Sequence, residues 1–424
     1  MKVLIIGQNF YDGSGGGVTL RNLFSNFNKN EIALATTYDL YSDDDSRHAD
    51  TIYLLGDKEY HVRFPFSLAQ KKFQSKVADN SKIKNVETPN YNKKLQHLFS
   101  GFLDFMRFLG LYNYMRDMSI SQSFLDWYDQ VKPDVVYTQL GSVYMLNFIN
   151  QLIAYRKPSL AIHIMDDWAR SLAGRAFYKK LIFRSIDNKF KNIISHSSKR
   201  ICISDAMAHE YMARYGGQWS AFHNSIEINS FQPNLEEKQP SGTFRIMYFG
   251  RIGLANKKSI EKFIEVVESI DKNVSFHIYT PDLKYLGRSN EKFVKTRFHD
   301  AVSYEQVQFL MRDANLLLLP LDFSKESVDF IQLSMPTKMP EYMSSGTPIF
   351  IFAPEKCAVV EYANKHKIAI TSTTDASSKL LEDLHFAIDH YPMLKQYAIT
   401  AKYLAEKNHN KREQAARFRE ILVG

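Results

Sequence analysis

Cysteine is scarce in this sequence of 424 residues, which contains only Cys202 and Cys357. The two stand far apart in apolar contexts, so they provide neither a disulfide framework nor a cysteine-rich metal site. The 13 histidines show no His-Glu-x-x-His spacing and no cluster with cysteine, which argues against a protein-bound metal. We therefore expect a protein of the reducing cytoplasm that holds no metal.

Long apolar runs are missing as well. The N-terminal run 2–7 is too short to span a bilayer and lacks a small-residue cleavage site, so it predicts a first buried strand. Charge is only mildly unbalanced, because 54 Lys and Arg against 46 Asp and Glu leave a net charge of +8. Without a long basic run or a nucleic-acid-binding signature, this excess suits an anionic ligand or a membrane face and not a nucleic acid.

The chain does show short apolar segments that alternate with amphipathic helical segments, which predicts parallel α/β domains. At about 150 residues per domain the length allows two or three domains, and we expect two. A polar stretch rich in proline, glycine and charge marks a linker between them. We predict a first domain over 1–228, a linker over 229–243, a second domain over 244–405 and a C-terminal helix over 406–424. This helix packs either back on the first domain or on the second domain, to which it is joined.

Strands are predicted wherever a run of Val, Ile, Leu or aromatic residues is bounded by polar or turn residues. In the first domain these runs are 2–7, 32–36, 51–55, 134–137, 160–164 and 200–203, and in the second they are 244–249, 274–279, 295–298, 315–319 and 348–352.

A glycine-rich loop over 12–18 stands between the first strand and the first helix. Backbone amides and the helix dipole make such a place an anion site, and we take Gly16 and Gly17 as candidate phosphate contacts. The loop lacks the Gly-Lys-Ser/Thr ending of a P-loop, and Val18 stands where a dinucleotide fingerprint has its third glycine. A plain tight turn is the alternative.

The second domain opens with the segment YFGRIGLANKKS, which reads as a strand, a turn and the start of a helix. Arg251 follows the strand, and Lys257 and Lys258 stand at the helix start. These cations are placed to clamp a diphosphate by charge-assisted hydrogen bonds. Solvated surface cations are the alternative.

The most informative stretch contains Pro-Thr-Lys-Met-Pro-Glu before an apolar strand. Pro340 is tolerated only in the first turn of a helix, which makes Thr337 the N-cap and leaves the amides near Lys338 and Met339 to bind an anion. One turn further, the Glu341 carboxylate is suited to accept both hydroxyls of a ribose. A capped helix with a surface glutamate is the alternative.

In these motifs the sequence resembles the glycosyltransferases of the GT-B fold, especially family 4, the retaining enzymes that use nucleotide sugars. HNSIEINSFQP is similar to the family's Asn-Gly-Val-Asp…Phe-x-Pro at the domain junction, and RICISDAMAHEYM is similar to the segment before it. FGRIG…KKS resembles the Gly-Arg-Leu…Lys-Gly clamp, and PTKMPEYMSSGTPI resembles the helix that ends in Glu-x-Met-x-x-Gly-x-Pro. The motifs follow the family's order over nearly the whole chain.

The resemblance implies two Rossmann-like domains that face each other across a cleft. It implies a hexosyltransferase type of enzyme with no cofactor besides its donor, a nucleotide-diphosphate sugar, and with a glycan or lipid-linked acceptor. Bacterial surface polysaccharide or glycolipid assembly is the setting that it suggests. The spacing to the apolar helix positions favours Lys258 over Lys257 as the clamp lysine, and the catalytic assistance expected of Arg251 and Lys258 is charge stabilisation on the departing diphosphate.

The sequence departs from the family at one acidic position, where an earlier glutamate falls on Leu333. This loss keeps open a non-catalytic sugar-nucleotide-binding protein as a second hypothesis. A dinucleotide-dependent enzyme is a third hypothesis, which explains the first glycine loop but gives the clamp and the Glu341 helix no purpose.

Acceptor-side residues are expected where the family places a His-Asp pair, after the strand that contains His163. Asp166 and Asp167 are candidates to orient sugar or acceptor hydroxyls, Asp167 with a catalytic role, and Trp168 is a candidate to stack on a sugar ring. An N-cap by either aspartate is the alternative. The acidic run 43–45 is interpreted as a polar loop and not as a metal-binding motif.

The segment 95–128 is rich in Phe, Leu, Met and Tyr and contains two arginines. A basic amphipathic helix pair of this kind can rest on an anionic membrane surface and receive a lipid-linked acceptor, which predicts peripheral contact with the inner face of the membrane. A core stripe or a subunit contact is the alternative.

Overall fold

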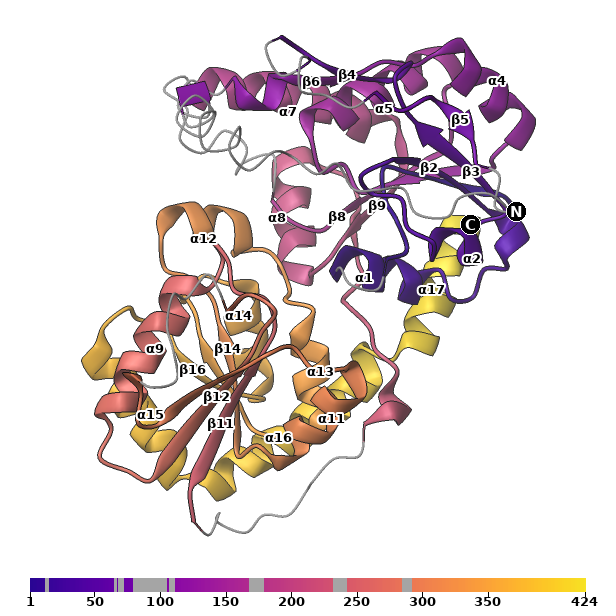
Figure 1. Cartoon of the computed structure of the whole chain (residues 1–424). Coiled ribbons are helices and arrows are strands. Elements are labelled where there is room, and N and C mark those ends of the chain that lie inside the picture. Colours follow the sequence, from indigo (N-terminus) through magenta and orange to yellow (C-terminus); the bar gives the residue numbers. More distant parts are fainter. Residues whose placement is uncertain are drawn as a thin grey trace. The chain divides into compact units, whose positions relative to one another are not determined.

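The computed structural model describes residues 1–11, 15–64, 67, 72–78, 105–106, 111–167, 179–231, 242–283 and 292–424. These residues form two compact units (Figure 1). The first unit comprises Met1–Phe222 together with Ala415–Gly424, and the second comprises His223–Gln414.

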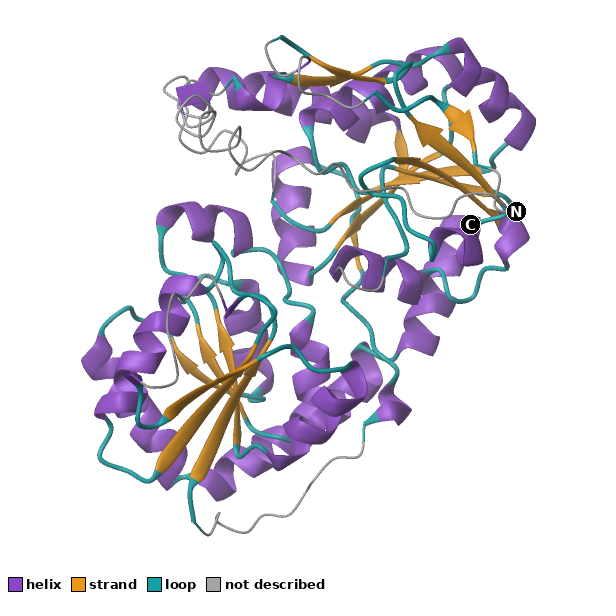
Figure 2. Cartoon of the chain, viewed as in Figure 1, coloured by secondary structure: helices purple, strands orange, loops and turns teal. Residues whose placement is uncertain are grey.

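The first unit is built on a sheet of eight strands in the order β10-β9-β8-β7-β1-β2-β3-β5 (Figure 2). Neighbouring strands are parallel except β3 and β5. The central strands β1, β2, β7 and β8 are buried along their whole length because both faces of a parallel sheet are covered. The strands are β1 (Val3–Ile6), β2 (Ile32–Thr37), β3 (Thr51–Leu55), β5 (Lys76–Val77), β7 (Val135–Thr138), β8 (Leu160–Ile164), β9 (Ser197–Cys202) and β10 (Ser220–Ala221), with a separate antiparallel pair of β4 (Tyr60–Val62) and β6 (Arg116–Met118).

Serine side chains begin three helices of the first unit. Ser121, Ser142 and Ser204 each accept a hydrogen bond from the amide three residues on, at the starts of α4, α5 and α8. Each cap satisfies one of the amides that a helix start leaves without a partner. The helices of this unit are α1 (Gly15–Leu23), α2 (Asp45–His48), α4 (Gln122–Val131), α5 (Val143–Arg156), α7 (Lys179–His196) and α8 (Asp205–Tyr215).

The second unit has an all-parallel sheet of six strands in the order β13-β12-β11-β14-β15-β16, with helices on both faces (Figure 2). The strands are β11 (Phe244–Phe249), β12 (Val274–Tyr279), β13 (Thr296–His299), β14 (Leu316–Pro320), β15 (Ile349–Phe352) and β16 (Ile370–Ser372). The helices are α9 (Lys257–Ser269), α11 (Tyr304–Asp313), α12 (Lys325–Ile331), α13 (Lys338–Ser345), α14 (Ala358–His366), α15 (Ser377–Asp389) and α16 (Tyr391–Asn408), followed by α17 (Lys411–Val423).

Both sheets start in the middle and change direction. In the second unit the chain runs from β11 outward through β12 and β13, then returns to the other side of β11 with β14. The first unit does the same from β1 through β2 and β3 and back to β7. Ligands of such folds bind at the carboxyl ends of the strands beside this reversal, which are the ends of β1 and β11 here.

The terminal helical region divides between the two units. Between α16 and α17 the backbone pairs with Ile226, which donates to the His409 carbonyl at 2.9 Å and accepts from the Lys411 amide at 3.0 Å. Residues 223–228 and 406–414, expected in the first domain and in the terminal segment, therefore belong to the second unit. The last ten residues pack on the first unit, where the Phe418 ring meets the Phe24 ring at 5.1 Å.

Arg419 on α17 holds the chain end to the first unit through Glu31. Its guanidinium contacts both carboxylate oxygens, at 2.6 and 3.0 Å, and this hydrogen bonding is the main cause that lowers the Glu31 pKa to about 2. A lowered folded-state pKa gives stability that is present above the ordinary pKa of 4.5 and is lost as the pH falls toward 2.

We expect Arg419→Ala to lower the free energy of unfolding by about 1 kcal/mol at pH 7, because the pair is partly exposed. Thermal unfolding between pH 7 and pH 3 should show the difference from wild type shrinking, because the Glu31 carboxyl of the unfolded chain is protonated below its ordinary pKa of 4.5. Arg412→Ala, on an exposed position of the same helix, is the matched control. An unchanged melting temperature at pH 7 in Arg419→Ala would show that the pair contributes nothing.

Candidate functional site

The turn after β11 lies at the carboxyl end of the strand next to the reversal of the second sheet. Gly250 has a φ of +139°, a conformation that side chains rarely adopt, and its amide donates to the Tyr279 carbonyl at 2.9 Å. Arg251 follows with an exposed side chain. The turn therefore presents a cation at the place where this fold binds ligands.

A set of hydrogen bonds fixes the backbone of this turn. The Arg251 carbonyl accepts a hydrogen bond from the Tyr248 hydroxyl at 2.6 Å and another from the side-chain amide of Asn256 at 3.0 Å. The Ile252 amide donates to the Asp282 carboxylate at 3.0 Å. Burial raises the pKa of the Tyr248 hydroxyl, which keeps it a donor. Arg251 thus projects from a backbone that is already held in place.

The start of α9 carries the two candidate clamp lysines. Lys257 is half-buried and Lys258 is exposed. Ser259, in place of the family's glycine, is buried and donates its hydroxyl to the Leu321 carbonyl at 2.8 Å. In the described part of the chain, neither Arg251 nor Lys258 forms a side-chain hydrogen bond or ion pair with another residue, which leaves both for an anionic ligand.

The start of α13 differs from the expected cap. Thr337 occupies the N-cap position, but its backbone is helical and its side chain makes no capping bond. The Met339 amide donates to the Pro336 carbonyl at 3.0 Å, so the prediction that this amide is left for an anion is wrong. The short turn over 336–339 takes up the amide instead. Pro340 is in the first turn, as expected, and is buried.

Lys338 and Glu341 form a half-buried charged pair in the first turn of α13. Burial raises the pKa of Glu341 to about 7, and Lys338 opposes that rise. Burial lowers the pKa of Lys338, and Glu341 opposes that change. The Tyr304 hydroxyl, at the start of α11, interacts electrostatically with the same carboxylate. Its pKa is raised to about 12, mainly by burial and to a lesser extent by the negative charge of Glu341. Glu341 therefore lies between an ammonium group and a phenol.

Aromatic side chains line the ends of the neighbouring strands. The Tyr279 ring stacks on Phe249 at 5.0 Å and on His299 at 4.4 Å, because the three residues are partners across β11, β12 and β13. His277 Nδ1 lies 3.0 Å from His299 Nε2. Sequence reasoning missed Tyr279 and Tyr304, and the signal for both was an aromatic residue directly at a strand end or helix start.

Gly16 and Gly17 lie in the first turn of α1 in the first unit, while residues 12–14 of the glycine loop fall outside the described residues. Gly17 is buried. A Cβ added at Gly16 would meet nothing within 4 Å, so space does not explain the glycine there. Phosphate contact by these two residues stays a prediction.

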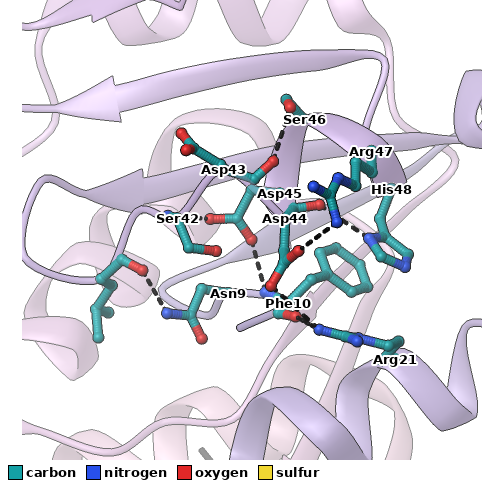
Figure 3. A network of polar contacts seen from close by, with 11 residues as sticks. Asn9, Phe10, Arg21, Ser42, Asp43, Asp44, Asp45, Ser46, Arg47 and His48 are labelled. Atoms are coloured by element: carbon teal, nitrogen blue, oxygen red, sulfur yellow. Dashed lines mark hydrogen bonds and ion pairs between the residues drawn. The ribbon is translucent and has the colours of Figure 1, made fainter. Parts of the chain in front are cut away.

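The acidic run 43–45 anchors the segment that follows β1 (Figure 3). The buried Asp45 carboxylate accepts from the Phe10 amide at 2.6 Å and from the Ser42 amide at 2.8 Å. Arg21 donates to the Phe10 carbonyl at 2.7 Å and pairs with Asp44 at 3.3 Å. Burial raises the pKa of Asp45 to about 6, although the two amides lower it. The run therefore holds backbone in place, as a polar loop does.

The side chain of Asp167 already has partners within the first unit, and its catalytic and acceptor-binding roles stay predictions. Its carboxylate is fully buried and accepts two hydrogen bonds from Arg214, at 2.9 and 3.0 Å, and one from Tyr211 at 3.0 Å. A buried carboxylate that has already found its partners joins α8 to the end of β8. Asp166 is half-buried beside it, and Trp168 lies outside the described residues.

The segment 95–128 is described only at 105–106 and from 111 onward. In that part, Phe124 and Trp127 on α4 are buried and pack around Tyr53, with ring distances of 5.5 and 5.2 Å. These aromatic side chains belong to the core and are not available to a membrane. In the same described residues, no helix combines the length and the apolar character that crossing a bilayer requires.

Two sheets with this strand order define an α/β protein of two units, the second of which has a cationic turn at the carboxyl end of its central strand β11. Solved structures share the fold over the whole chain. A sucrose-phosphate synthase from Thermosynechococcus elongatus has a TM-score of 0.65 at 11% identity, covering 99% of this chain and 98% of that one. Anabaena HepE in complex with UDP-glucose has a TM-score of 0.62 at 12% identity, covering 100% and 99%.

WaaG, a glycosyltransferase involved in lipopolysaccharide biosynthesis, is similar at a TM-score of 0.58 and 12% identity, with both chains fully covered. Residues 243–384 match the family model for glycosyl transferases group 1, which identifies the second unit as a glycosyltransferase domain. A comparison with curated protein sequences finds no match. The resemblance is thereby confirmed at its coarser level: the chain has the fold of the GT-B glycosyltransferases, and its second unit contains the matched glycosyltransferase segment.

Proposed function

We propose that this glycosyltransferase takes its sugar from a nucleotide-diphosphate sugar and binds that donor with the second unit. The observation that carries the proposal is the gathering of Arg251, Lys338 and Glu341, because the Lys338 side chain lies against Gly250 and brings the start of α13 to the turn of Arg251. All three residues lie within the matched segment 243–384. Cations and a carboxylate side by side suit a ligand with both phosphates and hydroxyls.

The chemistry that we assign to the site is stabilisation of the leaving group. The bond between the anomeric carbon and the β-phosphate oxygen breaks, and its electron pair stays on the diphosphate. The acceptor hydroxyl oxygen bonds to the anomeric carbon, and its proton passes to the departing diphosphate. Arg251 and Lys258 stabilise the negative charge that develops on the diphosphate. Glu341 accepts the ribose hydroxyls and so fixes the nucleoside.

The acceptor that we propose is a glycan or a lipid-linked sugar, transfer retains the anomeric configuration, and the setting is cytoplasmic assembly of a bacterial surface polysaccharide or glycolipid. The similarity in fold to WaaG supports such a setting. The family 4 resemblance supports retention. Peripheral membrane contact through 95–128 stays a prediction: of its described residues, Phe124 and Trp127 are in the core, whereas Phe105 and Leu111 are exposed.

Two measurements test the proposal. Thermal unfolding with UDP, GDP, ADP, dTDP and CMP should show one nucleoside diphosphate raising the melting temperature, since a ligand bound only by the native state stabilises it. Incubation with the corresponding nucleotide sugars should then release nucleotide. Binding without release would favour the non-catalytic sugar-nucleotide-binding protein, and no stabilisation by any nucleotide would contradict the donor assignment.

A further inference from the structure

The Lys338 side chain crosses directly over the Gly250 Cα. A Cβ placed on Gly250 would stand 2.0 Å from Lys338 Cε and 2.3 Å from Lys338 Nζ, far inside contact distance. The residue after this glycine is Arg251. The side chain of Lys338 therefore carries its ammonium group from the start of α13 to the carboxyl end of β11.

The surroundings of this ammonium group differ from those of the buried structural lysine of the same unit. Lys395 is 3% exposed, and its ammonium donates to the Gly346 carbonyl at 3.1 Å. Lys338 is half-buried, and within the described residues its ammonium forms no hydrogen bond, only a longer-range attraction to Glu341. A partly desolvated cation without an acceptor is stabilised by an anion that arrives with a ligand.

One of the backbone amides expected to bind an anion beside Lys338 is already bonded. The Met339 amide is bonded to the Pro336 carbonyl at 3.0 Å, and Thr337 makes no capping bond. An anion at the start of α13 therefore meets a side-chain ammonium and not a free Met339 amide. Gly250, which has no Cβ, leaves the space that this ammonium occupies.

We infer that Lys338 is a third cation of the donor site, and that its ammonium contacts the terminal phosphate of the nucleoside diphosphate, beside Arg251. The inference rests on the proposed function and adds a specific contact to it. It gives the chain a positive charge at the oxygen that receives the electron pair of the broken bond. The contact is absent from a nucleoside monophosphate, which lacks the terminal phosphate.

Isothermal titration with UDP and UMP tests the contact, or with the corresponding pair of another base if the thermal screen selects one. Lys338→Met keeps the length and apolar stem of the side chain and removes its charge. We expect it to weaken UDP binding by about tenfold, the effect of one charge-assisted hydrogen bond, and to leave UMP binding unchanged. Lys262→Met is the control, because that lysine is also partly buried but is paired with Asp375 at 2.5 Å.

UMP binding is the internal check on folding, since a misfolded variant loses both ligands. Gly250→Ala is a second variant, whose Cβ displaces the ammonium, and it should reproduce the selective loss of UDP binding. Unchanged UDP binding in Lys338→Met, or an equal loss of UDP and UMP in a variant with the wild-type melting temperature, would overturn the inference. If the wild type bound no nucleoside diphosphate, the proposed function and this inference would both fall. If the wild type bound UDP and Lys338→Met bound it equally well, the inference alone would fall.

Discussion

Arg251→Ala and Lys258→Ala are each expected to reduce turnover of the nucleotide sugar by about 10- to 100-fold. A hydrogen bond to a charged group contributes about 1.5 to 3 kcal/mol, and each 1.4 kcal/mol corresponds to a factor of ten. Both side chains are exposed and make no bond to another described residue, so the melting temperature should not change. The measurement is the rate of nucleotide release at saturating acceptor, together with thermal unfolding.

The choice between the two lysines at the start of α9 is tested in the same series. Lys257→Ala should keep most of the activity, because Lys258 is the more exposed of the two. Damage in Lys257→Ala alone would reverse that choice. Wild-type rates in both Arg251→Ala and Lys258→Ala would remove the clamp, and a fallen melting temperature would indicate a structural role.

The parallel strands could be predicted closely because their signal is local. The runs 51–55, 160–164, 244–249 and 274–279 coincide with β3, β8, β11 and β12. Strands covered on both faces are apolar throughout, and the polar residues around them mark their ends. The same alternation of strands and helices predicted parallel α/β domains, but the order of the strands within each sheet came only from the structure.

Features that depend on partners far along the chain could not be predicted. The edge strands β10 and β16 are only two and three residues long, and nothing in their composition separates them from loops. The break between α16 and α17 exists because Ile226, some 180 residues earlier, takes the backbone bonds of His409 and Lys411. The predicted C-terminal helix over 406–424 therefore runs across the end of α16, the break and α17.

The site shows the same division between local and distant causes. Arg251, Lys258 and Glu341 could be proposed because spacing places them beside strand ends and helix starts. The partner of Asp167 could not be predicted, since Arg214 stands on a different helix and only the fold reveals the bidentate pair. The role of the Lys338 side chain was likewise hidden, because its contact with Gly250 joins segments almost 90 residues apart.

Glu341→Gln should weaken binding of the nucleoside diphosphate by about 1.5 to 3 kcal/mol at pH 8, because an amide replaces the charged acceptor of the ribose hydroxyls. The raised Glu341 pKa of about 7 adds a pH dependence. With its raised pKa, the Glu341 carboxyl is partly neutral at pH 7 and becomes charged as the pH rises from 6 to 8. The affinity of the wild type for the nucleoside diphosphate should therefore rise over this range. Any rise in Glu341→Gln should be smaller, because the amide does not titrate. The fold should be unaffected at pH 7, since the change removes a carboxylate that burial disfavours in its charged form.

A 2′-deoxyribose nucleotide completes the test. The wild type should bind it more weakly than the ribonucleotide, while Glu341→Gln should show little further loss, because the missing hydroxyl and the missing carboxylate belong to the same contact. Calorimetric titration of both proteins with both nucleotides at pH 6 and pH 8 measures this coupling. Lys338 and Tyr304 face the same carboxylate, so Tyr304→Phe serves as the control for an indirect effect through the phenol. Additive losses, or selection of dTDP by the thermal screen, would show that Glu341 does not hold the 2′-hydroxyl. The glutamate would then be a residue of the first turn of α13 whose charge serves only its neighbour Lys338.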